Sequence, residues 1–113
     1  MRTEVSLSRV PRTMRAAASR LEEKVEHALS RFGRRVRAAE LVVRGGERDG
    51  VDLSCTVKVA LARGKAVVVK ATGATPAAAA AEGLRRARRV VADRLETVAA
   101  RNHGRRRVRR AVA

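Results

Sequence analysis

The chain of 113 residues has very few of the side chains on which several classes of protein depend. Phe32 is the only aromatic residue, since the chain has no Tyr and no Trp. Proteins that bind single-stranded nucleic acid commonly stack bases on aromatic rings, so we do not expect that mode of recognition. Cys55 is the only cysteine, which excludes an internal disulfide and predicts a small buried side chain on a strand.

Signals for catalysis and for membranes are missing as well. His27 and His103 are the only histidines, and neither has the spacing of a metal site or a catalytic triad. The chain has no G-x-x-x-x-G-K-[ST] loop and no apolar run long enough to cross a membrane. Its first fifteen residues lack the apolar core of a secretory signal. We therefore expect a cytoplasmic protein that is not an enzyme and needs no cofactor, metal ion, membrane or small-molecule substrate.

Acidic residues are scarce, and the resulting charge is the strongest signal in the chain. The sequence has 27 Lys and Arg against 11 Asp and Glu, which gives a net charge of +16. Such an excess destabilises a compact fold unless a polyanion neutralises it. Of the 27 cations, 23 are arginines, whose planar guanidinium groups pair with phosphate in bidentate fashion. Nucleic acid is therefore the expected partner.

The hydrophobic pattern predicts the element order β-α-β-β-β-α. Alternating apolar residues indicate strands over residues 4–10, 37–44, 51–61 and 66–72. Short turns between the last three strands predict antiparallel pairing. We therefore expect an α+β fold in which two helices pack on one face of a four-stranded, mainly antiparallel sheet.

The two helices are predicted from apolar stripes and capping residues. The first stripe ends at Phe32 and Gly33, and the helix starts either with Ser19 as N-cap or earlier, near Thr13. The second helix begins with Thr75 as N-cap and Pro76 at the first helical position. We expect it to fray after about residue 100, which divides the chain into a domain over residues 1–103 and a disordered basic tail over residues 104–113.

The charges of the first predicted helix are largely sorted by side. Around the first helix, Arg20, Lys24 and Arg31 share one flank, while Glu22 and Glu26 occupy the opposite flank. On the second helix, Arg86 and Arg89 are predicted to point outward near Glu82 and Asp93, with Arg85 and Arg94 on opposite flanks. An ordinary solvated helix mixes its signs, so this sorting favours a phosphate-binding surface. The candidate RNA-binding residues are Arg20, Lys24, Arg31, Arg34, Arg35, Arg85, Arg86, Arg89, Arg94, Arg105 and Arg106.

Three segments together resemble a known family. They are "LEEKVEHALSRF" (21–32), "VDLSCTVKVAL" (51–61) and "KAVVVKATG" (65–73). Their order and spacing are similar to the short ribosome hibernation promoting factors, or ribosome-associated translation inhibitors, over about residues 4–101. The chain departs from that family at "TPAAAAA" (75–81), where members often carry an acidic residue and an aromatic, and at "VPRTMRAAAS" (10–19), which is longer than usual.

The resemblance implies a function as well as a fold. Members of this family bind the small ribosomal subunit between head and body, where they occupy the path of mRNA and tRNA and inhibit translation. The resemblance therefore implies binding to rRNA near the decoding region, with the small subunit, its ribosomal proteins and whole ribosomes as partners. It assigns the phosphate-binding role first to Arg86 and Arg89.

Other functions stay open at the level of the sequence. A general RNA- or DNA-binding module, such as a double-stranded RNA binder or a nucleoid protein, would carry the same charge. The double-stranded RNA domain, however, begins with a helix, whereas a strand comes first here. A small metabolic enzyme would need a polar constellation that the sequence does not offer, and a regulator that acts through protein contacts would not need the charge.

Overall fold

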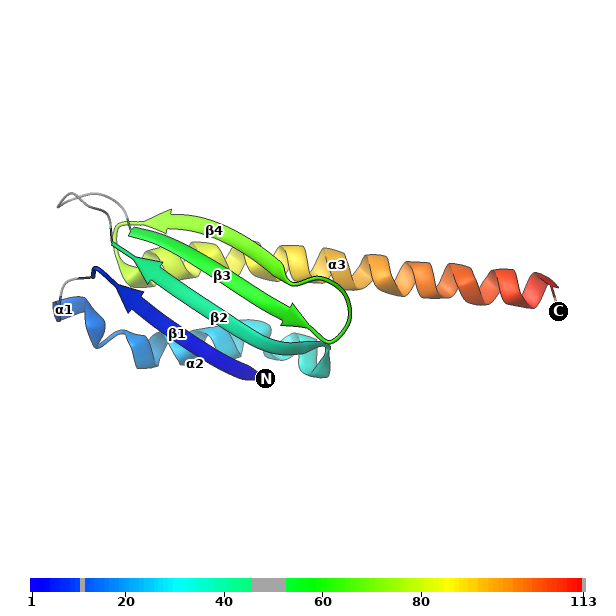
Figure 1. Ribbon diagram of the computed structural model, residues 1–113, viewed down its shortest axis with the longest axis horizontal. Coiled ribbons are helices and arrows are strands. Elements are labelled where there is room, and N and C mark those ends of the chain that lie inside the picture. The colour runs from blue at the N-terminus through cyan, green and yellow to red at the C-terminus, as the bar shows by residue number, and fades with distance from the viewer. Residues whose placement is uncertain (11, 46–52, 113) are drawn as a thin grey trace.

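The computed structural model describes the backbone of residues 1–10, 12–45 and 53–112, and the side chains of these residues as far as Thr97 with the exception of Thr13. Figure 1 shows a four-stranded sheet with the helices behind it and one long helix that extends beyond the sheet. In chain order the elements are β1 (Arg2–Ser8), α1 (Arg12–Arg15), α2 (Ala18–Leu29), the 3-10 helix η1 (Ser30–Arg35), β2 (Val36–Arg44), β3 (Leu53–Leu61), β4 (Val67–Gly73) and α3 (Pro76–Val112).

The strands lie in the order β1-β2-β3-β4. β1 is parallel to β2, with Val5 opposite Leu41, because the chain crosses over through α1 and α2 between them. The β2–β3 and β3–β4 pairs are antiparallel, so Val57 lies opposite Leu41 on one side and Val69 on the other. The predicted fold class is thus confirmed. The predicted strand start at Val51 lies outside the described residues.

The core lies between the sheet and the two main helices. Val25 and Leu29 of α2 and Val91 of α3 are almost completely buried, as are Cys55 and Val57 on the inner face of β3. Leu95 of α3 is only partly buried against this core. None of the charged side chains that the structure describes is buried, so every charge is available to solvent or to a partner.

The alanines at the start of α3 allow this helix to lie close to the sheet. Ala79, Ala80 and Ala87 are fully buried. A Cβ placed on Gly83 would lie 2.9 Å from a methyl group of Val57 and 3.2 Å from the Cys55 sulfur. The segment of small residues is therefore explained by close packing of helix on strand.

Three of the predicted helix ends can be compared with the structure. Thr75 caps α3 as expected, because its Oγ1 accepts a hydrogen bond of 3.1 Å from the Ala78 N–H. Ser19 is not an N-cap: α2 begins at Ala18, behind the separate short helix α1. The α-helix ends at Leu29, and Gly33 lies within the following η1 with a φ of 56°, a conformation that favours glycine.

The C-terminal end of α3 differs from the expected tail. Its backbone is helical through Val112, whereas the sequence predicted fraying after about residue 100. Arginine has a high helix propensity, and Gly104 is the only strong helix breaker in this segment, at a cost of about 1 kcal/mol. The division into a domain (1–103) and a disordered tail (104–113) stays a prediction.

Candidate nucleic-acid interface

Glu82, on the first turns of α3, organises the arginines that follow it. Its carboxylate accepts two hydrogen bonds from Arg85, with Nη2 at 2.7 Å and Nε at 3.1 Å, in a fork-to-fork pair. Arg86 Nε donates to the same carboxylate at 3.0 Å. The hydrogen bond from Arg85, above the other causes, lowers the pKa of Glu82 from 4.5 to about 2, and it raises the pKa of Arg85 in return. Glu82 is therefore fully ionised at neutral pH.

Arg86 and Arg89 were predicted to point outward together, but they have different surroundings. Arg86 also reaches back to the sheet, where its Nη1 donates to the Lys70 carbonyl at 2.9 Å. β4 is an edge strand, so this carbonyl has no neighbouring strand to bond. Arg89 is exposed and makes no hydrogen bond or ion pair with any residue described in the structure, and the same holds for Arg88. Arg86 is thus braced, whereas Arg88 and Arg89 present free guanidinium groups.

The basic flank of α2 borders the groove between the helices. Arg20 lines this groove opposite Thr75 and Pro76 at the start of α3. Lys24 lies one turn further along the same side of α2, and both side chains are exposed. The groove, of about 460 Å³, therefore has one cation, Arg20, among its lining residues, and the start of α3 forms its other side.

The remaining predicted residues lie around η1 and beside the turn that precedes β4. Arg31 stacks its guanidinium over the Phe32 ring at 5.1 Å, and Arg35 Nε donates to the Phe32 carbonyl at 3.1 Å. Arg94 Nη1 donates to the Lys65 carbonyl at 3.0 Å. Arg34 is exposed beside them. The side chains of Arg105 and Arg106 lie outside the part of the chain that the structure describes.

The predicted residues therefore fall into two groups. Arg20, Lys24, Arg85, Arg86 and Arg89 belong to the helical layer; together with Arg88, which the sequence analysis did not select, they form what we call the helical face. Arg31, Arg34, Arg35 and Arg94 lie toward the end of the domain where η1 meets the β3–β4 turn. The sequence analysis did not select Arg37, Arg63 and Lys65, which lie at the same end. A signal was present, because these residues stand in long stretches of sequence without acidic residues.

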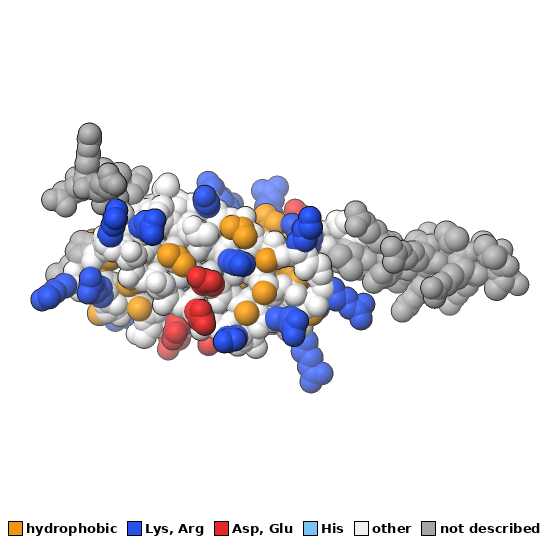
Figure 2. Space-filling view, in the orientation of Figure 1, with side chains coloured by type: hydrophobic (Ala, Val, Ile, Leu, Met, Phe, Trp, Pro, Cys, Tyr) orange, Lys and Arg blue, Asp and Glu red, His pale blue; other side chains and the backbone are white. Residues whose placement is uncertain are grey.

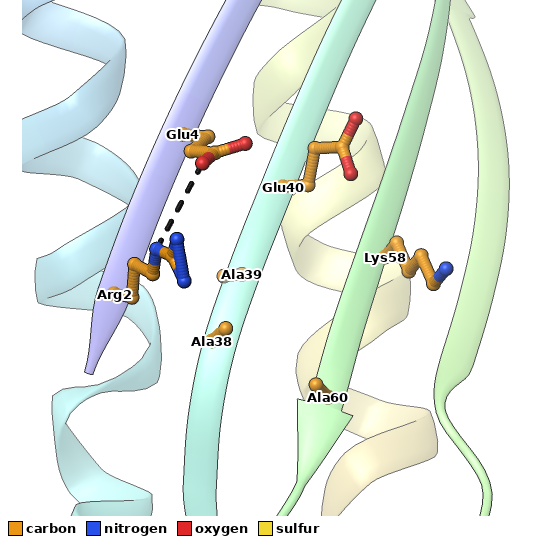
Figure 3. Close-up of a pocket in the computed structure, with 7 residues that line it drawn as sticks. All are labelled: Arg2, Glu4, Ala38, Ala39, Glu40, Lys58 and Ala60. Atoms are coloured by element: carbon orange, nitrogen blue, oxygen red, sulfur yellow. Dashed lines mark ion pairs between the residues drawn. The ribbon is translucent and has the colours of Figure 1, made fainter.

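The opposite face of the sheet is not covered by helices (Figures 1 and 2). Figure 3 shows a shallow pocket there, lined by side chains of both signs and by small residues, namely Arg2, Glu4, Ala38, Ala39, Glu40, Lys58 and Ala60. Arg2 and Glu4 form a long ion pair of 3.9 Å, and Lys58 points away from both carboxylates. The polar groups do not converge on one point, as a catalytic site would require.

Outside this pocket, the described residues offer no reactive thiol and no cluster suited to a metal ion. Burial raises the pKa of the Cys55 thiol to about 11, so the thiol is protonated and unreactive at neutral pH. Within the described residues, no group of three or more His, Cys, Asp or Glu side chains is placed to hold a metal ion. No helix in the described part of the chain is long and apolar enough to cross a bilayer.

Comparisons with known proteins agree with this architecture. No protein-family model and no curated protein matches the sequence. Among solved structures, the N-terminal domain of Protein Y from Thermus thermophilus superimposes with a TM-score of 0.62 at 18% identity, over 80% of this chain and 96% of that domain. A ribosomal subunit interface protein from Coxiella burnetii gives a TM-score of 0.59 at 13% identity, over 88% of this chain and 99% of its own. The chain shares their fold.

This likeness concerns the fold, because the sequence identities are low. At the level of the fold it confirms the resemblance found in the sequence. One fold can carry several functions, so the function must be argued from the surface of this chain.

Proposed function

We propose that the protein is a ribosome-associated hibernation factor that binds rRNA of the small subunit near the mRNA and tRNA decoding region and inhibits translation. The observation that carries the proposal is the helical face: exposed cations on two helices of a rigid domain whose fold is also that of a ribosomal subunit interface protein. Ribosomes are the partner, through rRNA and ribosomal proteins, and the protein acts in the cytoplasm.

The chemistry of the helical face suits folded RNA. Arg88 and Arg89 have guanidinium groups without partners among the described residues, so they can bind phosphate oxygens without first breaking an ion pair to any of these. Arg20 and Lys24 add exposed cations on α2, and Arg20 lines the groove between α2 and the start of α3. Phe32, the only aromatic residue, is buried and cannot stack on a base. Recognition therefore depends on phosphate positions and on the shape of the RNA.

Inhibition follows from occupancy of the binding site. A rigid domain held by several phosphate contacts in the path of mRNA and tRNA would exclude both while it stays bound. Contacts of this kind release counterions, so occupancy should depend steeply on salt. The basic residues from 104 onward would reinforce binding by charge alone.

Co-sedimentation with ribosomes tests the proposal. The protein should migrate with small subunits and whole ribosomes in a sucrose gradient and should inhibit translation in a reconstituted system. If it neutralises 6–10 phosphates, raising salt from about 50 to 200 mM should weaken binding by roughly 10³–10⁵-fold. Failure to co-sediment at low salt would exclude a ribosomal role.

A general RNA- or DNA-binding module is the second candidate. It is favoured by the wide distribution of exposed cations, which also occur on α1 and at the end of β2. Such a module should bind an unrelated duplex of RNA or DNA as tightly as it binds ribosomes. Competition between a 30-base-pair duplex and purified small subunits at 150 mM salt separates the two candidates.

A further inference from the structure

A second concentration of positive charge lies at one end of the domain. There the β3–β4 turn (residues 62–66) meets η1, because the Ala62 N–H donates to the Arg35 carbonyl at 2.8 Å and Val36 pairs with Leu61. The two segments are more than twenty residues apart in sequence, yet their backbones are in direct contact. This end is opposite the one where β1 leads into α1 (Figure 1).

Both segments bring exposed cations and no carboxylate. We call Arg34, Arg37, Arg63 and Lys65 the basic end; all four are exposed. Residues 27–39 and 53–81 contain no Asp or Glu, and none of the four side chains forms an ion pair with a described carboxylate. Figure 2 shows several Lys and Arg side chains around the end of the sheet from which α3 extends. Four like charges without a counter-ion repel one another, and a bound polyanion would relieve that repulsion.

The backbone that carries the basic end is held in place. Phe32 is buried and anchors η1 to the core, with Arg31 stacked on its ring and Arg35 bonded to its carbonyl. Arg94 of α3 fixes the β3–β4 turn through its hydrogen bond to the Lys65 carbonyl. Three arginines of this region, Arg31, Arg35 and Arg94, are thus used to brace the scaffold, while the four cations of the basic end have no partner among the described residues. A preformed scaffold reduces the entropy that binding must overcome.

We infer that the basic end is a second phosphate-binding surface, which takes an RNA backbone segment different from the one bound by the helical face. This inference rests on the proposed function for the identity of the RNA. Because the four cations come from two separate segments, they suit a polyanion with several phosphates better than a single small anion. The domain would then bridge two backbone segments of folded rRNA with one rigid body.

Charge-neutral variants test this surface against a matched control. The end variant carries Arg34→Gln, Arg37→Gln and Arg63→Gln, and it spares the bracing residues Arg35 and Arg94. The control carries Arg12→Gln, Arg15→Gln and Arg44→Gln, three exposed arginines of the opposite end. Ribosome binding is measured from 50 to 300 mM KCl, with melting temperatures to verify the fold. Loss of three phosphate contacts should lower the slope of log K against log salt by about 2.7 in the end variant only. Equal slopes for the two variants would overturn the inference.

A tethered cleavage reagent tests the position directly. Cys55 is buried and protonated, so a single surface cysteine can be labelled selectively with a haloacetamide derivative of Fe-EDTA, whose halide leaves as the thiolate attacks. Arg63→Cys and Ala81→Cys, both at exposed positions, place the label at the basic end and on α3, respectively. We expect both labels to cleave rRNA, at different sites. Cleavage of rRNA from α3 without cleavage of rRNA from position 63 would refute the second surface. Cleavage of an acidic ribosomal protein, in place of rRNA, by the reagent at position 63 would refute it as well.

The outcome for the inference can be separated from that for the proposed function. If the wild-type protein does not bind ribosomes, the proposed function fails. The same two triple variants are then titrated with a 30-base-pair RNA duplex. A lower salt slope in the end variant than in the control would still support a phosphate-binding surface at the basic end, and equal slopes would exclude it.

Discussion

The arginines of α3 should separate into two classes, one that carries binding and one that carries stability. Arg88 and Arg89 have no described partner, whereas Arg86 and Arg94 each donate a hydrogen bond to a backbone carbonyl at or beside β4. We compare two double variants, one that combines Arg88→Ala and Arg89→Ala and one that combines Arg86→Ala and Arg94→Ala. Both double variants remove two charges from the same helix, so net charge is matched between them.

The structure sets the expected magnitudes. Removing the two carbonyl bonds should cost about 0.5–1.5 kcal/mol each, whereas the exposed pair should change the free energy of unfolding by no more than about 0.5 kcal/mol. For a domain of this size, 1 kcal/mol corresponds to about 4–8 °C in melting temperature. If Arg88 and Arg89 each contact one phosphate, their loss should lower the slope of log K against log salt by about 1.8. The loss of affinity caused by the two substitutions should therefore be roughly 60-fold larger at 0.1 M salt than at 1 M salt.

Two measurements decide the outcome. Thermal unfolding followed by circular dichroism gives stability, and co-sedimentation with ribosomes across a salt series gives affinity and slope. The variant without Arg86 and Arg94 should melt several degrees lower and keep most of its salt dependence. The variant without Arg88 and Arg89 should keep its melting temperature and lose part of its salt dependence. Equal losses of ribosome binding at unchanged melting temperatures would mean that only net charge matters, and the assignment of roles would be wrong.

The fold could be predicted because its signals are local and repeated. In β3, every second residue from Leu53 to Leu61 is apolar, and each of these side chains is buried. The apolar stripe of α2 at Leu21, Val25 and Leu29 is equally regular and equally buried. The parallel pairing of β1 with β2 follows from the intervening helix, which leads the chain back to the end of the sheet where β1 began.

The roles of single arginines could not be predicted in this way. The position of Arg86 around the helix is fixed by the sequence, but its bond to the Lys70 carbonyl depends on which strand lies beneath that side of α3. The basic end was missed for the same reason, since only the tertiary fold brings Arg34 and Arg63 into neighbouring segments. Stretches of sequence without acidic residues offered a signal, yet they did not show which cations share a surface.

Two further predictions concern stability. Leu29→Ala should lower the free energy of unfolding by about 2–5 kcal/mol because Leu29 is 1% exposed. Leu95→Ala should lower it clearly less because Leu95 is only partly buried. Urea titrations that give the larger loss to the Leu95 variant would contradict this packing. Glu82→Gln should lower the melting temperature slightly at pH 7. Because the pKa of Glu82 is lowered from 4.5 to about 2 in the folded state, its ion pairs stabilise the protein fully above about pH 4.5, and this contribution is lost as pH falls through 2. Other carboxylates titrate in both proteins, so the difference between wild type and variant isolates Glu82. That difference, followed by melting at steps between pH 7 and pH 2, should shrink below pH 4.5, and a constant difference would show that Glu82 does not act through its charge.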